Sequence, residues 1–276
     1  MLSRLWAYWW APRRFRGYKP QPVTRASISR WLRQFDKKDH RALLRLLRRV
    51  RYFSEDETRD ALVELNDRLL AHLSAAGLAE ESVIYVSVHD PGSSSHVMLN
   101  LLRDAALLER RGCRFLDWRD TMRLHTLTNE LEQGAIVYVD DFAGTGHQFC
   151  RSRNFAAEYF VGTFAEYFLL PCICEEAAMM IQSCGVEPRY AHLHTQTERP
   201  LHNASNMLRR DAKTRLLDLC RTVHGHGGSG LGYGELATAV VFYRNAPNTV
   251  PLLLRGNISQ NRYVGVLPRT TDLSAR

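Results

Sequence analysis

Two continuous runs of β-branched and aromatic residues limit the folds open to this chain. Residues 82–88 read SVIYVSV and residues 135–139 read AIVYV. Runs of this kind are typical of strands buried on both faces, as in parallel sheets covered by helices. Helical patterns lie between and after them, and alternation of strands and helices is typical of α/β proteins. We therefore predict an α/β fold, a mostly parallel sheet with helices on both faces.

The hydrophobic periodicity places the other elements. Helices are expected at about 27–35 and 39–51, before the first strand. Ser54 and Glu57 form an S-x-x-E capping box, which predicts a long amphipathic helix ending near Gly77. Further along, we expect a helix at about 97–110, a strand at 113–117, strands in EYFLLPCI, RYAHLH and ELATAVVFY, and helices in EEAAMMIQSC and NMLRRDAKTRLLDLCRTV.

The chain is long enough for a large core with an appendage, since it has 276 residues and is 45% apolar. We divide it into a basic aromatic arm at 1–24, a helical N-terminal extension at 25–78 and an α/β domain at 79–276. No apolar run approaches the roughly 20 residues that span a bilayer, and the N-terminus lacks the core of a signal peptide. We expect a cytoplasmic protein without membrane contact. Six irregularly spaced cysteines predict reduced, mostly buried thiols.

Positive charge is concentrated at the N-terminus. Residues 1–51 contain 15 of the 37 Lys and Arg but only two of the 29 Asp and Glu, so they carry a net charge of +13 and the remainder −5. This asymmetry predicts contact with nucleic acid or another anionic partner, and interleaved aromatics such as Trp9 suit base stacking. A solvated face of the amphipathic helix HRALLRLLRRVR explains the charge equally well. The candidate contacts are Arg13, Arg14, Arg16 and Lys19.

The stretch Val137–Gln148, VYVDDFAGTGHQ, is the strongest candidate for a ligand site. An apolar strand ends in Asp140 and Asp141, and a Gly/Thr-rich turn follows at once. In parallel sheets ligands bind at the carboxyl ends of strands. A helix starting near His147 would direct its N-terminal N–H groups at an anion. Carboxylates that accept hydrogen bonds from hydroxyl groups, next to backbone N–H groups that bind phosphate, suit a ribose 5-phosphate. The alternative is a strand–turn–helix with a purely structural role.

A second loop follows the first buried strand. It reads HDPGSSSH at 89–96 and precedes a helix. Small hydroxyl residues before a helix can bind phosphate oxygens, although they can also be helix caps. The candidates are Ser93, Ser94 and Ser95.

The first of these loops resembles the phosphoribosyl-diphosphate loop of type I phosphoribosyltransferases, in which two acids after a strand precede a small residue and Thr-Gly-x-Thr. Asp140, Asp141, Gly144, Thr145 and Gly146 match, and Gln148 replaces the closing Thr. The helical preface and the APNTVPLLL tail resemble the phosphoribosyltransferase-like proteins of bacterial conflict systems, which occur in antiphage loci and as retron accessory proteins. The resemblance spans roughly residues 27–268.

The resemblance implies a type I phosphoribosyltransferase-like domain with a defined set of ligand contacts. Asp140 and Asp141 would be catalytic, holding the ribose hydroxyls directly or through Mg²⁺, and Ser93 to Ser95 would bind the pyrophosphate. The contacts to the 5-phosphate would come from Ala143, Gly144, Thr145, Gly146, His147 and Gln148.

Two functions remain open on this basis. The first is a phosphoribosyltransferase-like effector of a retron-type antiphage system, binding a phosphoribosyl or nucleotide ligand. The second is a catalytically silent nucleotide-sensing or scaffold subunit that docks a reverse transcriptase and its RNA or DNA. Two departures from the family pattern bear on activity. The loop at 89–96 has no Lys or Arg. In type I enzymes a mobile segment called the hood also carries catalytic side chains, and the corresponding residues here, about 119–133, show no recognisable hood signature. A plain DNA-binding protein is the third option, but the sequence has no readable recognition motif.

Overall fold

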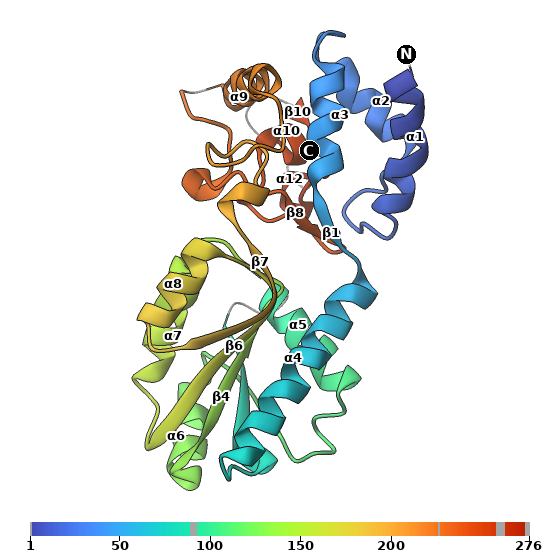
Figure 1. Cartoon of the computed structure of the whole chain (residues 1–276). Coiled ribbons are helices and arrows are strands. Elements are labelled where there is room, and N and C mark those ends of the chain that lie inside the picture. The colour runs from blue at the N-terminus through green and yellow to red at the C-terminus, as the bar shows by residue number, and fades with distance from the viewer. Residues whose placement is uncertain (1, 89–92, 226, 258–262, 274–276) are drawn as a thin grey trace. The chain divides into compact units, whose positions relative to one another are not determined.

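The computed structural model describes residues 2–88, 93–225, 227–257 and 263–273. The chain forms two compact units (Figure 1). One contains Asp56–Leu193, and the other combines Met1–Glu55 with His194–Arg276. The division into an arm at 1–24, an extension at 25–78 and an α/β domain from 79 onward stays a prediction.

The large sheet belongs to the unit Asp56–Leu193. Its strands follow the order β3-β2-β4-β6-β5, and β7 also pairs with β6. The pairs β2–β3, β2–β4, β4–β6 and β5–β6 are all parallel, which confirms the predicted α/β class. The strands are β2 (Val83–Ser87), β3 (Arg114–Asp117), β4 (Gln133–Val139), β5 (Phe142–Ala143), β6 (Thr163–Cys174) and β7 (Glu187–His194).

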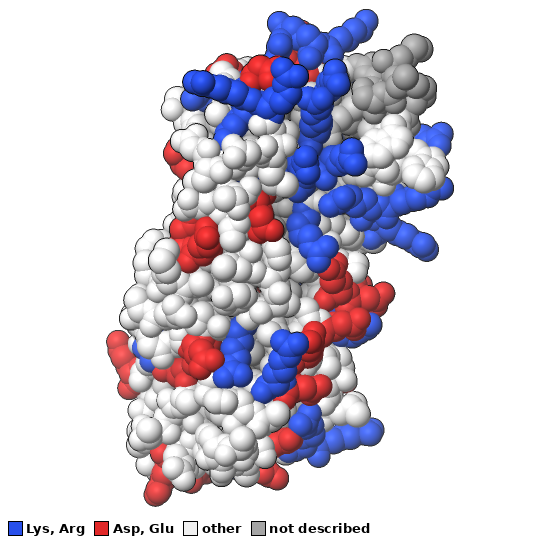
Figure 2. Space-filling model, in the orientation of Figure 1, with Lys and Arg blue, Asp and Glu red and all other residues white. Residues whose placement is uncertain are grey.

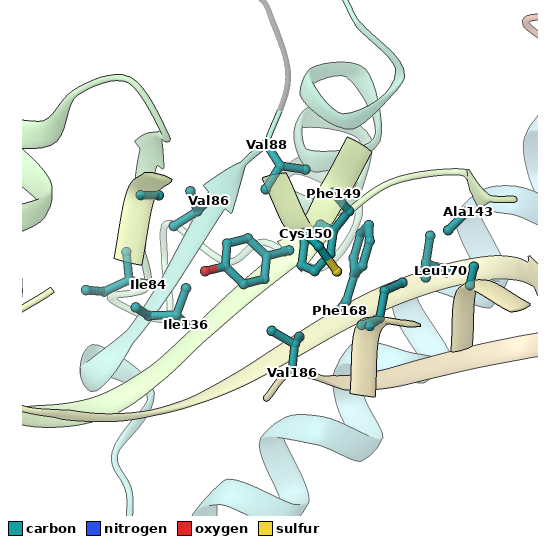
Figure 3. Close-up of a cluster of buried hydrophobic side chains, with 14 of the residues drawn as sticks. Ile84, Val86, Val88, Ile136, Ala143, Phe149, Cys150, Phe168, Leu170 and Val186 are labelled. Atoms are coloured by element: carbon teal, nitrogen blue, oxygen red, sulfur yellow. The ribbon is translucent and has the colours of Figure 1, made fainter. Parts of the chain in front are cut away.

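Helices cover both faces of this sheet. Successive residues of a strand point to opposite sides, so neighbouring residues of β2 contact different helices. Ile84 and Val86 of β2 belong to the buried cluster that contains Phe149 of α7 (Figure 3). Tyr85, between them, donates a hydrogen bond of 2.5 Å to Asn66 of α4 on the other face. The helices of this unit are α4 (Glu55–Ala75), α5 (Ser94–Ala105), α6 (Thr121–Leu131), α7 (His147–Ala157) and α8 (Glu175–Ser183), with a 3₁₀ turn η1 (Glu80–Ser82).

The second unit is mainly helical. Its small parallel sheet pairs β1 with β8, and Phe53 stacks on Phe242 at 5.0 Å between ring centroids. The run ELATAVVFY therefore forms a strand outside the large sheet. Its elements are α1 (Leu2–Arg14), α2 (Arg25–Arg33), α3 (His40–Arg49), β1 (Arg51–Phe53), η2 (Gln196–Glu198), α9 (Arg210–His224), η3 (Tyr233–Glu235), β8 (Val240–Phe242), α10 (Leu252–Arg255), β9 (Gly256–Asn257), β10 (Tyr263–Val264) and α12 (Thr270–Leu273).

Residues 2–14, within the segment predicted as a basic aromatic arm, form a regular helix. Ala7, Ala11 and Phe15 are buried, with exposed fractions of 1%, 0% and 1%. Their spacing of four residues is that of one helix face. Pro12 falls in the last turn of α1. This short apolar stripe makes α1 part of a packed core.

The cysteines differ in part from the expectation of reduced thiols. Cys150 of α7 and Cys184, at the C-terminal end of α8, form a disulfide. The other four, Cys113, Cys172, Cys174 and Cys220, are buried thiols, as expected. Among the described residues no helix is both long and apolar enough to cross a membrane.

Candidate functional site

The loop after β4 is held against the sheet at both ends. The Asp140 N–H donates to the Leu169 carbonyl of β6 at 3.2 Å. Two residues later, Phe142 and Ala143 form β5, which pairs with the end of β6. The Asp140 side chain is 4% exposed, and its Oδ1 accepts the Asp141 N–H at 2.8 Å. Asp141 itself is only half-buried. The two carboxylates thus lie together at the carboxyl end of β4, one inside and one at the surface.

Gly146 makes the turn from this loop into α7. It is the N-cap residue of α7 and has a left-handed backbone with φ 78°. A Cβ at this position would lie 3.0 Å from Cβ and 3.1 Å from Cγ of Met180 in α8, so both conformation and space favour glycine. His147 and Gln148 begin α7 and are exposed. The first N–H groups of a helix have no partner within the helix, which favours an anion there.

Phe149 anchors α7 directly behind the loop. Its ring stacks on Phe168 of β6 at 4.1 Å and meets Tyr138 of β4 edge-on at 5.1 Å. Figure 3 shows Phe149 and Phe168 side by side within the buried cluster. The start of α7 is therefore fixed relative to the end of β4 and the middle of β6, which the sequence pattern alone did not indicate.

An ion pair ties α7 to the sheet farther along. Arg153 Nε donates to Glu166 Oε2 of β6 at 2.8 Å, and its Nη2 bonds the other carboxylate oxygen. The Tyr138 hydroxyl donates to the same Oε2 at 2.7 Å. Burial and the Glu166 charge raise the pKa of Tyr138 well above its usual value, so this phenol stays protonated. The hydrogen bond from Arg153 to Glu166 raises the pKa of Arg153.

Of the loop at 89–96, the described residues Ser93 to Ser95 lead into α5 near the ends of β2 and β4, which are parallel neighbours. Ser95 joins their ends: its Oγ accepts the Val88 N–H at 3.1 Å and donates to the Val139 carbonyl at 2.8 Å. Ser95 is fully buried, so its hydroxyl serves the backbone. Ser93 is the N-cap of α5, where its Oγ accepts the His96 N–H at 3.5 Å. Ser94 is half-buried, and residues 89–92 of the predicted loop lie outside the described residues.

The expected hood region, about 119–133, contains a helix in the structure. Asp120 caps α6 by accepting the Arg123 N–H at 3.2 Å. Arg123 and His125 are exposed on this helix, and the Arg119 guanidinium lies 5.5 Å from the Trp118 ring centroid.

The basic residues predicted for partner binding belong to the second unit. The Arg13 guanidinium stacks on the Trp9 ring at 3.9 Å, and Arg14 donates to the Val50 carbonyl at 2.8 Å. Lys19 pairs with Glu55 at 3.2 Å. Arg16 is exposed. The carboxylate of Glu55 thus already balances Lys19.

A parallel α/β sheet with two loops meeting at the carboxyl ends of neighbouring strands is the arrangement of a ligand-binding α/β protein. The chain belongs to the PRTase-CE family, whose model matches residues 28–269. This membership confirms the predicted phosphoribosyltransferase-like fold.

Two solved structures are similar to parts of the chain. One is orotate phosphoribosyltransferase from Aeropyrum pernix, 16% identical over 50% of this chain and 72% of that chain, with a TM-score of 0.32. The other is a hypothetical protein from Neisseria gonorrhoeae with bound ppGpp, 10% identical over 62% of this chain and 97% of that chain, with a TM-score of 0.35. No curated protein matches the chain.

Proposed function

We propose that the protein binds a 5-phosphoribosyl ligand, either 5-phosphoribosyl diphosphate or a nucleotide, at the Asp140–Gln148 loop and transfers the phosphoribosyl group. The observation that carries this proposal is the joining of the ends of β2 and β4 by Ser95, with paired carboxylates directly before the N-terminus of α7. Family membership supports the same reaction class.

The proposed roles follow the exposure of each group. Asp141 is half-buried next to the strand end and accepts hydrogen bonds from the ribose hydroxyls. The buried Asp140 accepts the Asp141 N–H, which holds that backbone in place, and adds negative charge. Thr145, Gly146 and Gln148 bind the 5-phosphate with the neighbouring N–H groups and with those of Ala143, Gly144 and His147. Ser93 and Ser94 contact the diphosphate. We assign Ser95 a positioning role, since both polar functions of its hydroxyl serve Val88 and Val139.

In the proposed transfer an acceptor attacks C1 of the ribose, and the bond from C1 to the diphosphate oxygen breaks. The bonding electron pair leaves with the diphosphate, so positive charge develops at C1. Carboxylates near the ribose and N–H donors at the phosphates act by positioning and by electrostatics. Adjacent carboxylates beside a diphosphate suit Mg²⁺, which takes oxygen ligands from one or two carboxylates and substrate phosphates. Asp140 and Asp141 would hold this ion, which would neutralise the departing diphosphate.

We also propose a biological setting and one alternative. The helical preface and the tail support an effector of a retron-type antiphage system, because their sequences resemble such proteins. The alternative is a silent nucleotide-sensing or scaffold subunit that docks a reverse transcriptase and its nucleic acid. Gln148 at the position of the closing Thr, and a serine loop without Lys or Arg, favour this alternative.

Calorimetric titration with 5-phosphoribosyl diphosphate tests the proposed site. We expect saturable binding that weakens when EDTA removes Mg²⁺ and is lost in the variant Asp140→Asn/Asp141→Asn. The matched control, Asp211→Asn/Asp218→Asn, removes the same charge from the exposed face of α9 in the other unit and should bind normally. Undiminished binding by a folded Asp140→Asn/Asp141→Asn protein would contradict the proposal.

Pyrophosphate release separates the two candidate functions. If the protein is an enzyme, it should release pyrophosphate from bound 5-phosphoribosyl diphosphate when an acceptor nucleobase is supplied. The silent subunit binds the ligand with the same dependence on Asp140 and Asp141 but releases none with any nucleobase.

A further inference from the structure

Two helices of the second unit, α1 and α3, form one basic and aromatic surface. We define the α1–α3 surface as Trp6, Trp9 and Arg13 of α1 with Arg48 and Arg49 of α3. The Arg48 guanidinium lies 4.7 Å from the Trp6 ring centroid, so the two helices meet at this pair. Trp6 is 49% exposed and Trp9 57%. Each ring has an arginine against it, Arg48 at Trp6 and Arg13 at Trp9, and still leaves about half of its surface accessible to a ligand.

The charge of α3 is not balanced by nearby acids. Among the described residues, none of the helix arginines Arg41, Arg45, Arg48 and Arg49 has a carboxylate within 4.0 Å. The two acids of residues 1–51 form ion pairs with other residues: Asp36 pairs with Lys38 at 3.2 Å, and the buried Asp39 pairs with Arg215. In Figure 2, Lys and Arg gather in the upper right of the view, whereas the lower part shows acidic and basic residues side by side.

Several arginines of this unit act electrostatically on one another. The pKa of Arg14 is lowered by burial first, and then by the positive charges of Arg51 and Arg48. Arg41, Arg45 and Arg48 follow each other at intervals of four and three residues, which places them on one face of α3. Like charges held together in this way are relieved by a bound polyanion.

We propose that the α1–α3 surface binds single-stranded nucleic acid, with Trp6 and Trp9 stacking on bases and the arginines contacting phosphates. Base stacking on exposed aromatic rings combined with a basic track is the general mode of single-strand binding. A duplex offers its phosphates but keeps its base faces covered. An acidic protein would match the arginines and leave the exposed tryptophan rings without a role. The proposal does not depend on phosphoribosyl binding, because the two sites lie in different units of the chain.

Fluorescence anisotropy of the full chain with a labelled oligodeoxythymidylate tests this surface. We expect Trp6→Ala/Trp9→Ala to weaken binding by about tenfold or more, since each lost stacking contact is substantial. Trp6→Phe/Trp9→Phe should retain most of the affinity. Arg48→Ala/Arg49→Ala should weaken binding and reduce its salt dependence, because fewer counterions are released. The matched control, Arg68→Ala/Arg110→Ala, removes two exposed charges from the other unit and should bind as wild type.

Competition identifies the class of ligand. Single strands should displace the probe more effectively than duplex DNA or inorganic polyphosphate. The proposal is overturned if Trp6→Ala/Trp9→Ala, shown to be folded by circular dichroism, binds like wild type. It is also overturned if polyphosphate competes as well as a single strand, which would indicate a surface for anions in general, including acidic proteins.

Discussion

Ser95 connects the two candidate loops through a single hydroxyl. We predict that Ser95→Ala lowers the free energy of unfolding by about 1–3 kcal/mol, because it leaves the buried Val88 N–H and Val139 carbonyl without their partner. Urea denaturation of both proteins measures the difference. Ser94→Ala is the control, since this half-buried neighbour should change stability by no more than about 0.5 kcal/mol.

Arg153 is predicted to stabilise the protein by compensating a nearly buried carboxylate. The side chains of Arg153 and Glu166 are 20% and 8% exposed. We expect Arg153→Met to cost about 3–5 kcal/mol, since it leaves the nearly buried Glu166 carboxylate without its ion-pair partner. The double variant Arg153→Met/Glu166→Leu should be more stable than the single variant, and thermal unfolding compares them. A double variant as unstable as the single one would contradict this account.

The sequence predicted the local structure around the candidate site but not every side-chain contact. Asp140 and Asp141 directly follow the buried strand β4, and Gly146 precedes the helix α7, as the pattern predicted. Ser95 was expected to contact ligand, yet its hydroxyl bonds two backbone groups. A single sequence holds no signal that separates a bridging serine from a ligand-binding one. The partnership of Arg153 and Glu166 was equally invisible, because it joins a helix to a strand across the fold.

The disulfide between Cys150 and Cys184 joins α7 to the end of α8. It closes a loop with a sequence separation of 34. Cross-linking a loop of this length stabilises by roughly 3–4 kcal/mol in the chain-entropy model. We predict that dithiothreitol lowers the free energy of unfolding by about this amount, and that Cys150→Ser/Cys184→Ser has the same effect and abolishes the response to dithiothreitol. An equal response of wild type and double variant would show that the bond does not contribute.

At the element scale, continuous apolar runs were the reliable signal. The runs at 82–88 and 135–139 form the neighbouring strands β2 and β4, because strands buried on both faces need apolar residues throughout. The short strand β1 was missed, since its three residues continue an amphipathic helical pattern. Its partner β8 is separated from it by most of the chain, and periodicity carries no information on such pairing.

At the scale of the whole molecule, the N-terminal segment is part of a packed core. We predict that deleting residues 1–24 lowers the melting temperature, because it removes the buried Ala7, Ala11, Phe15 and Tyr18. Differential scanning calorimetry measures the shift. Unchanged thermal stability would mean that α1 does not contribute to the core. The substitutions at Trp6 and Trp9 are therefore a cleaner test of nucleic-acid binding than truncation.

The asymmetry of charge was visible in the sequence, but the grouping of the chain into units was not. Residues 194–276 pack with residues 1–55, and contacts such as Trp31 Nε1 donating to the Leu253 carbonyl at 2.8 Å join them. These contacts connect residues more than 200 positions apart, so local patterns could not predict them.

Amide hydrogen exchange can locate the proposed phosphoribosyl ligand, which we expect to bind where the loop Asp140–Gln148 enters α7. With 5-phosphoribosyl diphosphate and Mg²⁺, we predict slower exchange in peptides covering Asp140–Phe149 and Ser93–Val97. The variant Asp140→Asn/Asp141→Asn should show no such protection. Ligand-induced protection confined to other parts of the chain, with these two segments unchanged, would contradict the account.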